Sequence, residues 1–127
     1  MVKVIKPGMF STVQDKGREG LQSYGIPQSG SMDSFSSDLG NKILGNAIDT
    51  AVLEITMVGP VLEFEFPTFI CITGADLSAS VQNMNIPMNT VVPIKSNDIL
   101  SFGALKSGLR AYIAVLGGFK TEKVYNS

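Results

Sequence analysis

The chain has 127 residues, of which 44% are hydrophobic and 17% charged, and its formal net charge is −1. This balance predicts a folded protein with a hydrophobic core, because disordered chains combine low hydrophobicity with high net charge. Without an excess of basic residues, nucleic acid and anionic membrane surfaces are not expected partners. No apolar run reaches the roughly 18 residues of a membrane span, and the N-terminus does not resemble a signal peptide.

The residue types that are missing narrow the chemistry. The sequence contains no histidine and one cysteine. Catalysis with an imidazole base and zinc sites with Cys and His ligands are therefore excluded within the chain, and no metal site is expected. Any general acid or base must be Asp, Glu, Lys, Tyr or a bound group. Cys71 lies in a short apolar run, which predicts a buried, unreactive thiol and favours a reducing, cytoplasmic compartment.

Two short strands and a long irregular segment are predicted at the start of the chain. Val2–Lys6 is rich in apolar residues and ends at the turn dipeptide Pro7-Gly8. Met9–Gln14 is predicted as a second strand, and the glycine-rich residues 15–33 follow without a regular pattern. Loops of this length inside a compact domain are uncommon and are more often functional than decorative.

One helix is predicted, over about residues 33–45. Asp33 is a good N-cap because its carboxylate can accept amide hydrogens of the first turn. Gly45, followed by an asparagine, supplies the left-handed stop. Apolar residues recur at the i, i+4, i+8 spacing that places them on one helix face, and these are Phe35, Leu39 and Ile43.

From residue 52 onward the pattern is that of short strands separated by turns. Val61–Phe66 alternates apolar and polar residues, which is typical of a strand with one face in water. Phe69–Thr73 is continuously apolar and is expected to be covered on both faces, with a turn at residues 74–76. The other predicted strands are Val52–Met57, Leu77–Val81, Thr90–Ile94, Ile99–Phe102 and Arg110–Leu116, with a hairpin tip at Asn83–Asn85. Short strands beside one helix predict a mainly β fold, a small barrel or sandwich.

The segment Gln14–Asp33 contains the richest candidate chemistry. Its glycines allow the backbone to approach a ligand closely and to expose amide groups. Arg18 can hold a carboxylate or phosphate in a bidentate manner, and Asp15 or Asp33 can act as a base or orient a substrate. A purely structural glycine-rich loop with a helix cap at Asp33 explains much of the same pattern.

Two further acidic residues are candidates. Glu54 is flanked by leucine and isoleucine, so it lies on the wet face of its strand, the favoured interpretation, or is a buried acid with a raised pKa. Asp76 follows a buried strand and can face a cleft, although an ordinary turn carboxylate is the favoured interpretation. The sequence has no phosphate loop of the Gly-x-x-x-x-Gly-Lys-Ser/Thr type, so nucleotide chemistry is expected on a partner.

Several ordered motifs resemble those of one known family. The first group is Lys6-Pro7-Gly8, Thr12-Val13-Gln14-Asp15-x-Gly17-Arg18-x-Gly20 and Gly25-Ile26-Pro27-x-x-Gly30-x-Met32-Asp33. The later motifs are Leu44-Gly45-Asn46, Leu53-Glu54-Ile55-Thr56, Gly59-Pro60, Thr73-Gly74-Ala75-Asp76-Leu77 and Arg110-Ala111-Tyr112-x-Ala114-Val115-x-Gly117-Gly118. Across essentially its whole length the chain resembles the start of the 5-oxoprolinase C-subunit family, also called KipA-like or allophanate hydrolase subunit 2-like, among the biotin-dependent carboxyltransferases.

The resemblance implies a cyclophilin-like β-barrel in which residues 1–127 form one domain, the first half of a longer protein with two related halves. It implies a cytoplasmic component of an ATP-dependent enzyme that hydrolyses 5-oxo-L-proline to L-glutamate, acting with 5-oxoprolinase subunits A and B (KipI-like). The catalytic residues that it suggests are Asp15, Arg18, Asp33, Glu54 and Asp76. The substrate-binding residues that it suggests are Gln14, Gly17, Gly25, Pro27, Gly30 and Met32.

Two other functions fit the same resemblance. One is the carboxyltransferase domain of a biotin-dependent urea carboxylase or urea amidolyase, in which carboxybiotin donates to urea. The other is a non-catalytic KipA-like module that binds a KipI-like protein. ATP is expected to be used by the whole complex, and biotin is a cofactor only in the carboxyltransferase alternative.

Overall fold

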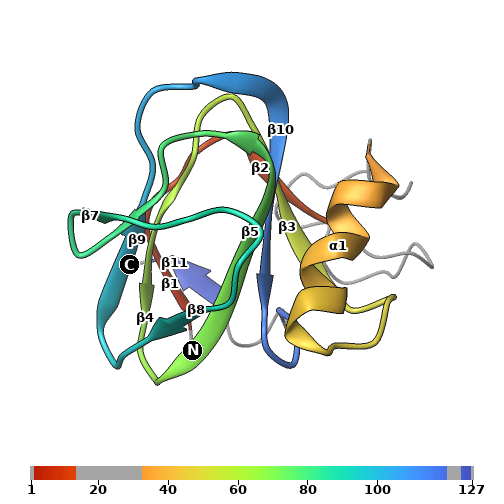
Figure 1. Ribbon diagram of the computed structural model, residues 1–127. Coiled ribbons are helices and arrows are strands. Elements are labelled where there is room, and N and C mark those ends of the chain that lie inside the picture. The colour runs from red at the N-terminus through yellow and green to blue at the C-terminus, as the bar shows by residue number, and fades with distance from the viewer. Residues whose placement is uncertain (1, 14–32, 120–123, 127) are drawn as a thin grey trace.

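The computed structural model describes residues 2–13, 33–119 and 124–126 as two β-sheets that face each other, with one helix outside them (Figure 1). Sheet A has the strand order β11-β1-β4-β9-β6-β7, and its strands are β1 (Val2–Lys6), β4 (Val61–Phe64), β6 (Ser80–Val81), β7 (Met84–Asn85), β9 (Asp98–Ser101) and β11 (Val124–Asn126). Sheet B has the order β2-β3-β10-β5-β8, and its strands are β2 (Phe10–Val13), β3 (Val52–Thr56), β5 (Thr68–Asp76), β8 (Val92–Ile94) and β10 (Ser107–Val115).

The fold is mainly β with one described helix, as the sequence predicts. Neighbouring strands are antiparallel except for β1 and β11, which run parallel. The predicted barrel is an open one, because no strand pair among the described residues closes the two sheets into a single cylinder. The predicted hairpin is also present: β6 and β7 pair across Gln82 and Asn83, and both of these residues have positive φ.

The main hydrophobic core lies between the two sheets, and strand alternation decides which side chains enter it. On β10, Ala111, Ile113 and Val115 belong to this core, whereas Tyr112 and Ala114 belong to a second cluster on the opposite face of sheet B. Helix α1 (Ser34–Leu44) packs over that opposite face, against β5 and β10 (Figure 1). The central strands of sheet B are therefore covered on both sides, which explains their continuous apolar runs.

The caps of α1 agree with the prediction, but its buried face does not. Asp33 is the N-cap and Gly45 is the C-cap, in the left-handed conformation with φ of 80°. The side of α1 that is buried against sheet B carries small and polar residues, and these are Ser37, Gly40 and Asn41. A Cβ on Gly40 would lie 2.9 Å from the Cβ of Ala114, so the helix approaches the sheet too closely for large side chains. The stripe predicted for burial lies on another side, and Phe35 is 73% exposed.

This arrangement predicts opposite effects for two substitutions on α1. Phe35→Ser is expected to change the free energy of unfolding by no more than about 0.5 kcal/mol, because the ring is already in water. Gly40→Val is expected to cost about 1–3 kcal/mol, because it forces α1 away from β10. Urea unfolding of both variants measures the difference. A larger loss for Phe35→Ser than for Gly40→Val would contradict the observed packing.

The end of α1 is fixed to the end of β10 by an asparagine. The Asn46 side-chain amide donates to the Val115 carbonyl at 2.9 Å and to Asn41 Oδ1 at 3.0 Å, and its oxygen accepts the Gly117 amide at 2.9 Å. Two motifs separated by about seventy residues, around Asn46 and Gly117, are thereby joined. Buried polar groups that are satisfied in this way specify one helix position over the sheet.

Three further details separate the structure from the predicted elements. The predicted turn at residues 74–76 is wrong, because β5 continues through them to Asp76. The predicted strand Leu77–Val81 is reduced to its last two residues. Cys71 is buried as expected, and burial raises the pKa of its thiol. No helix in the described part of the chain is long and apolar enough to cross a membrane.

Candidate functional site

A row of polar side chains crosses sheet B on the face that α1 covers. Glu54 of β3 lies opposite Tyr112 of β10, and Tyr112 lies opposite Thr73 of β5. All three are buried, with exposed fractions of 7% for Glu54, 1% for Tyr112 and 0% for Thr73. Buried polar groups are costly without partners, so the row must be satisfied by hydrogen bonds.

The row is hydrogen-bonded within itself and to the first turn of α1. Tyr112 Oη donates to Glu54 Oε2 at 2.6 Å and accepts the Asp33 main-chain N–H at 3.1 Å. Thr73 Oγ1 donates to the Ser36 carbonyl at 2.6 Å. The hydroxyl hydrogen of Tyr112 goes to Glu54, because the Asp33 amide already uses a lone pair of the oxygen. The beginning of α1 is therefore attached to the sheet at two points.

The favoured expectation for Glu54, a wet strand face, is wrong. Strand alternation does separate Glu54 from the main core, but α1 covers the face on which it lies. The neighbouring Tyr112 shows the effect of this environment. Burial, and then the hydrogen bond and negative charge of Glu54, raise the pKa of the Tyr112 hydroxyl well above its ordinary range. The phenol is thus held neutral, as a donor to Glu54.

Asp33 is exposed and joins this row to a pocket. Its Oδ1 accepts the Ser36 amide at 3.1 Å and its Oδ2 accepts the Ser36 hydroxyl at 2.7 Å. These hydrogen bonds lower the pKa of the Asp33 carboxyl, the side-chain bond having the larger effect. The carboxylate is therefore ionised and fixed in orientation, while each oxygen keeps a lone pair for a further donor.

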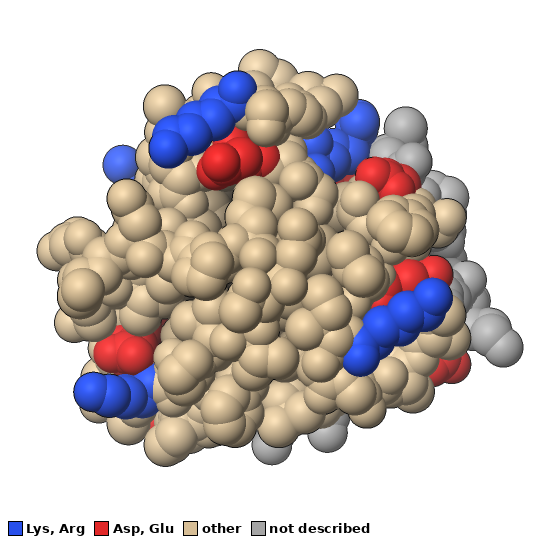
Figure 2. Space-filling view, viewed as in Figure 1, with Lys and Arg blue, Asp and Glu red and all other residues tan. Residues whose placement is uncertain are grey.

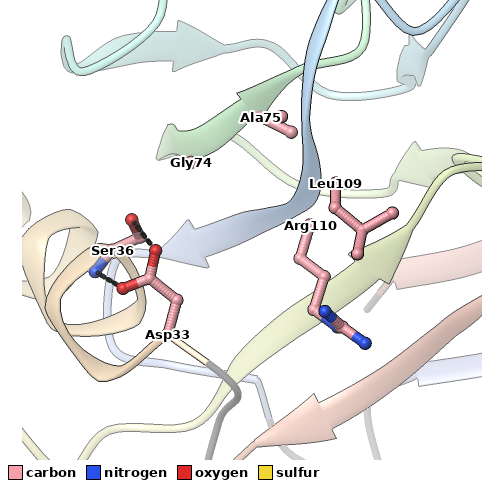
Figure 3. Close-up of a pocket in the computed structure, with 7 residues that line it drawn as sticks. Asp33, Ser36, Gly74, Ala75, Leu109 and Arg110 are labelled. Carbon is pink, nitrogen blue, oxygen red and sulfur yellow. Dashed lines mark hydrogen bonds between the residues drawn. The ribbon is translucent and has the colours of Figure 1, made fainter.

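The pocket has a volume of about 310 Å³ and lies where the β5–β10 ladder is interrupted. The register of the two strands shifts between Ser107 and Ala111, which is a β-bulge. Figure 3 shows the helix start on one side of this opening and the two strands on the other. The residues that line the pocket are Asp33, Ser36, Gly74, Ala75, Gly108, Leu109 and Arg110.

Two glycines allow the bulge to form. Gly74 and Gly108 have φ of +84° and +79°, which L side chains rarely adopt. A Cβ on Gly74 would lie 2.5 Å from the Arg110 carbonyl oxygen, and one on Gly108 would lie 2.9 Å from Ala75. The floor of the pocket is therefore made of backbone, and neither position has room for a side chain.

Arg110 is the one cationic side chain among the residues that line the pocket. No hydrogen bond or ion pair occupies its guanidinium within the described ranges of the chain. In Figure 3 the Asp33 carboxylate turns to Ser36, and no interaction joins it to Arg110. The pocket thus presents an anionic acceptor and a cationic donor that do not neutralise each other.

Of the site residues suggested by the sequence, the structure brings Asp33 to the pocket and Glu54 to the hydrogen-bonded row behind it. Asp76 lies at the end of β5 and does not line the pocket; its Oδ1 accepts the Ser78 amide at 3.0 Å, a local turn contact. The remaining suggested residues lie outside the described ranges, and these are Gln14, Asp15, Gly17, Arg18, Gly25, Pro27, Gly30 and Met32.

Sequence reasoning missed Arg110 and Tyr112 as site residues. Both belong to a motif that carries the family resemblance, and their spacing of two places them on the same face of a strand. That face was not known to be functional before its partners on β3 and β5 were seen. In the described part of the chain no group of three or more acidic, Cys or His residues could hold a metal ion. On the face in Figure 2, acidic and basic side chains lie near one another around a broad uncharged area.

Comparison with known families decides the classification. Residues 24–127 match the family described as "Carboxyltransferase domain, subdomain A and B". The chain belongs to this family. The family residues that converge in the structure come from three motifs, around Glu54, Thr73 and Tyr112.

Individual relatives are parts of two kinds of enzyme. The chain is 37% identical over 127 residues to urea amidolyase of Saccharomyces cerevisiae, covering 99% of this chain and 7% of that protein. It is 33% identical over 127 residues to the 5-oxoprolinase C-subunit of Escherichia coli, covering 100% of this chain and 41% of that protein. The crystal structure of K. lactis urea amidolyase matches with a TM-score of 0.81 and 38% identity, over 92% of this chain and 7% of that one. The chain thus spans less than half the length of these relatives.

Proposed function

We propose that the chain is part of the C-subunit of a cytoplasmic 5-oxoprolinase, acting with subunits A and B in ATP-dependent hydrolysis of 5-oxo-L-proline to L-glutamate. The observation that carries this proposal is the pocket with Asp33 and Arg110 on its lining and no ion pair between them. 5-Oxoproline has a carboxylate for the cation and a ring N–H for the anion. The similarity to a bacterial 5-oxoprolinase C-subunit over the whole chain supports the same proposal.

In this proposal the chain's own residues bind and orient the substrate. Arg110 can hold a carboxylate with two parallel hydrogen bonds, and the ionised Asp33 can accept a hydrogen bond or a proton from the reacting amide. ATP supplies the free energy for opening the lactam. The pocket has one cation and its glycines do not belong to a phosphate loop, so we assign ATP binding to the partner subunits.

One observation favours a second candidate, the carboxyltransferase domain of a urea carboxylase or urea amidolyase. The identity to the yeast urea amidolyase, 37%, is higher than that to the bacterial 5-oxoprolinase C-subunit, 33%. Carboxybiotin would then enter the pocket from another domain, because no lysine for biotin attachment lines it. Arg110 could pair with the carboxylate that biotin carries, and Asp33 could accept from a urea N–H.

The deciding experiment measures glutamate release from 5-oxoproline by the full-length gene product with its neighbouring A and B subunits. We expect release that requires ATP, is lost when the product of this gene is omitted, and is unaffected by avidin, which sequesters biotin. Urea-dependent ATP cleavage that avidin abolishes would establish the second candidate instead. A stable complex with the KipI-like partner and no turnover of either substrate would overturn both enzyme functions.

A further inference from the structure

The lining of the pocket is chemically divided, and the division suggests what the pocket recognises. Backbone of the β5–β10 bulge and the Leu109 side chain form an apolar or neutral part. Charge enters from Asp33 at the start of α1 and from Arg110 on β10. Small-molecule sites are commonly of this kind, with a few polar groups that fix orientation in an otherwise apolar cavity.

Asp33 is held in place more firmly than an exposed carboxylate usually is. Ser36 binds both of its oxygens, and its main-chain N–H is attached to the buried Tyr112. Tyr112 is in turn fixed by Glu54 at 2.6 Å. The acceptor therefore has little conformational freedom to lose when a ligand binds, which is the condition for a strong directional contact.

Arg110 differs from the other described cations near the pocket. Lys106 lies in the connection that leads into β10, is exposed and does not line the pocket. The Arg110 side chain is half-buried, and its guanidinium has no partner within the described ranges. A guanidinium in a partly desolvated cavity gains most from a ligand oxyanion that can accept two hydrogen bonds at once.

We infer that this pocket is a recognition site for small cyclic amides that carry a carboxylate, in which Arg110 reads the carboxylate and Asp33 reads the ring N–H. The inference rests on the proposed function in naming 5-oxoproline as the natural member of this class. The volume of about 310 Å³ is at the lower end for ligand sites and suits a five-membered ring with one substituent. The two contacts are independent, because each uses a different ligand group.

This independence allows a test in which each protein variant is matched to one change in the ligand. The three probes are 5-oxoproline, 2-pyrrolidinone, which lacks the carboxylate, and 5-oxotetrahydrofuran-2-carboxylate, in which oxygen replaces the ring N–H. Dissociation constants are measured by NMR titration of the full-length protein. The variants are Arg110→Gln, Asp33→Asn and the control Lys106→Gln, and asparagine keeps the N-cap of α1.

Arg110→Gln is expected to weaken both carboxylate probes by roughly 10- to 100-fold and to leave 2-pyrrolidinone within about twofold. Asp33→Asn is expected to weaken both N–H probes by about 3- to 10-fold and to leave the ring-oxygen probe unchanged or tighter. Lys106→Gln is expected to change none of them by more than about twofold. Equal losses for all probes in either pocket variant, or no binding of 5-oxoproline by the unsubstituted protein at any soluble concentration, would overturn the inference.

The binding test and the activity test fail separately. The expected ratios without any glutamate release would leave the recognition site in place and remove the proposed function. Glutamate release with an unchanged KM in Arg110→Gln would keep the proposed function and remove the site from this pocket.

Discussion

Tyr112→Phe is expected to lower the free energy of unfolding by about 1–3 kcal/mol, although it removes a single oxygen atom. That oxygen is the donor to buried Glu54 and the acceptor for the main-chain amide of Asp33. Its loss removes a charge-assisted bond from the buried carboxylate and leaves the amide at the start of α1 without this acceptor. Groups stripped of a partner in a buried site cost more than the net value of the bond itself.

Urea unfolding measures this loss, and a double-mutant cycle with Glu54→Gln separates the pair from the remaining effects. We expect a coupling energy of about 1–2 kcal/mol between Tyr112 and Glu54, because they are in direct contact. Ser80→Ala is a suitable control, since it removes a part-buried hydroxyl that is bonded only to the Ser101 hydroxyl. A cycle whose two single effects simply add would show that the short hydrogen bond contributes nothing to stability.

The same variant has a signature at alkaline pH. The pKa of Tyr112 is raised in the folded protein, so the unfolded chain loses this proton first, near pH 10. Above that pH the unfolded state binds fewer protons than the folded state, and stability falls as pH rises. Tyr112→Phe removes this contribution, so the gap in stability between the two proteins should narrow above pH 10. A constant gap across pH 8 to 11.5 would contradict the raised pKa.

Loss of the Tyr112 hydroxyl also reaches the pocket, through the main chain of Asp33. The variant keeps both charged groups of the proposed recognition site but releases one attachment of the Asp33 backbone. Weaker binding of the N–H probes, with binding of the ring-oxygen probe retained, would identify Tyr112 as a positioning residue. It contacts no ligand group itself, because it does not line the pocket.

The extent to which the sequence predicts this site depends on how far apart the deciding residues lie in the chain. Asp33 and Gly45 were predictable as helix caps because capping is a contact within a few residues. The burial of Glu54 was not, since it depends on Tyr112, a partner 58 positions away, and on the helix that covers both. Likewise Phe35 belongs to an apolar stripe, yet the face of α1 that packs on the sheet is set by close approach at Gly40.

The β-bulge is the clearest case of information that a linear pattern does not contain. The continuous apolar run at residues 69–73 predicted β5, and its glycine suggested a turn, because glycine with positive φ is common in turns. In the structure Gly74 has this conformation inside a strand. Whether such a glycine ends a strand or bends it depends on the register with its neighbour, here the shift between Ser107 and Ala111 of β10. The pocket exists because of that shift.

Gly74→Ala is accordingly expected to be the most damaging single-methyl addition near the site, with a loss of about 3–4 kcal/mol. Part of this loss, about 1–2 kcal/mol, comes from a positive φ of 84° in a residue with a Cβ. The rest comes from the Cβ itself, which would lie 2.5 Å from the Arg110 carbonyl oxygen and must push β10 away from β5. Gly117→Ala is the matched control, because its φ is 83° and nothing lies within 4 Å of its Cβ.

Urea unfolding of the two variants compares backbone strain alone with strain plus overlap. We expect Gly117→Ala to lose only the strain contribution, and Gly74→Ala to lose about twice as much or more, together with its binding of 5-oxoproline. Binding is lost because the displaced strand carries both the floor of the pocket and Arg110. Equal losses of stability with intact binding would mean that the bulge relaxes around the methyl group. The pocket floor would then be a tolerant surface, and recognition would rest on the charged side chains alone.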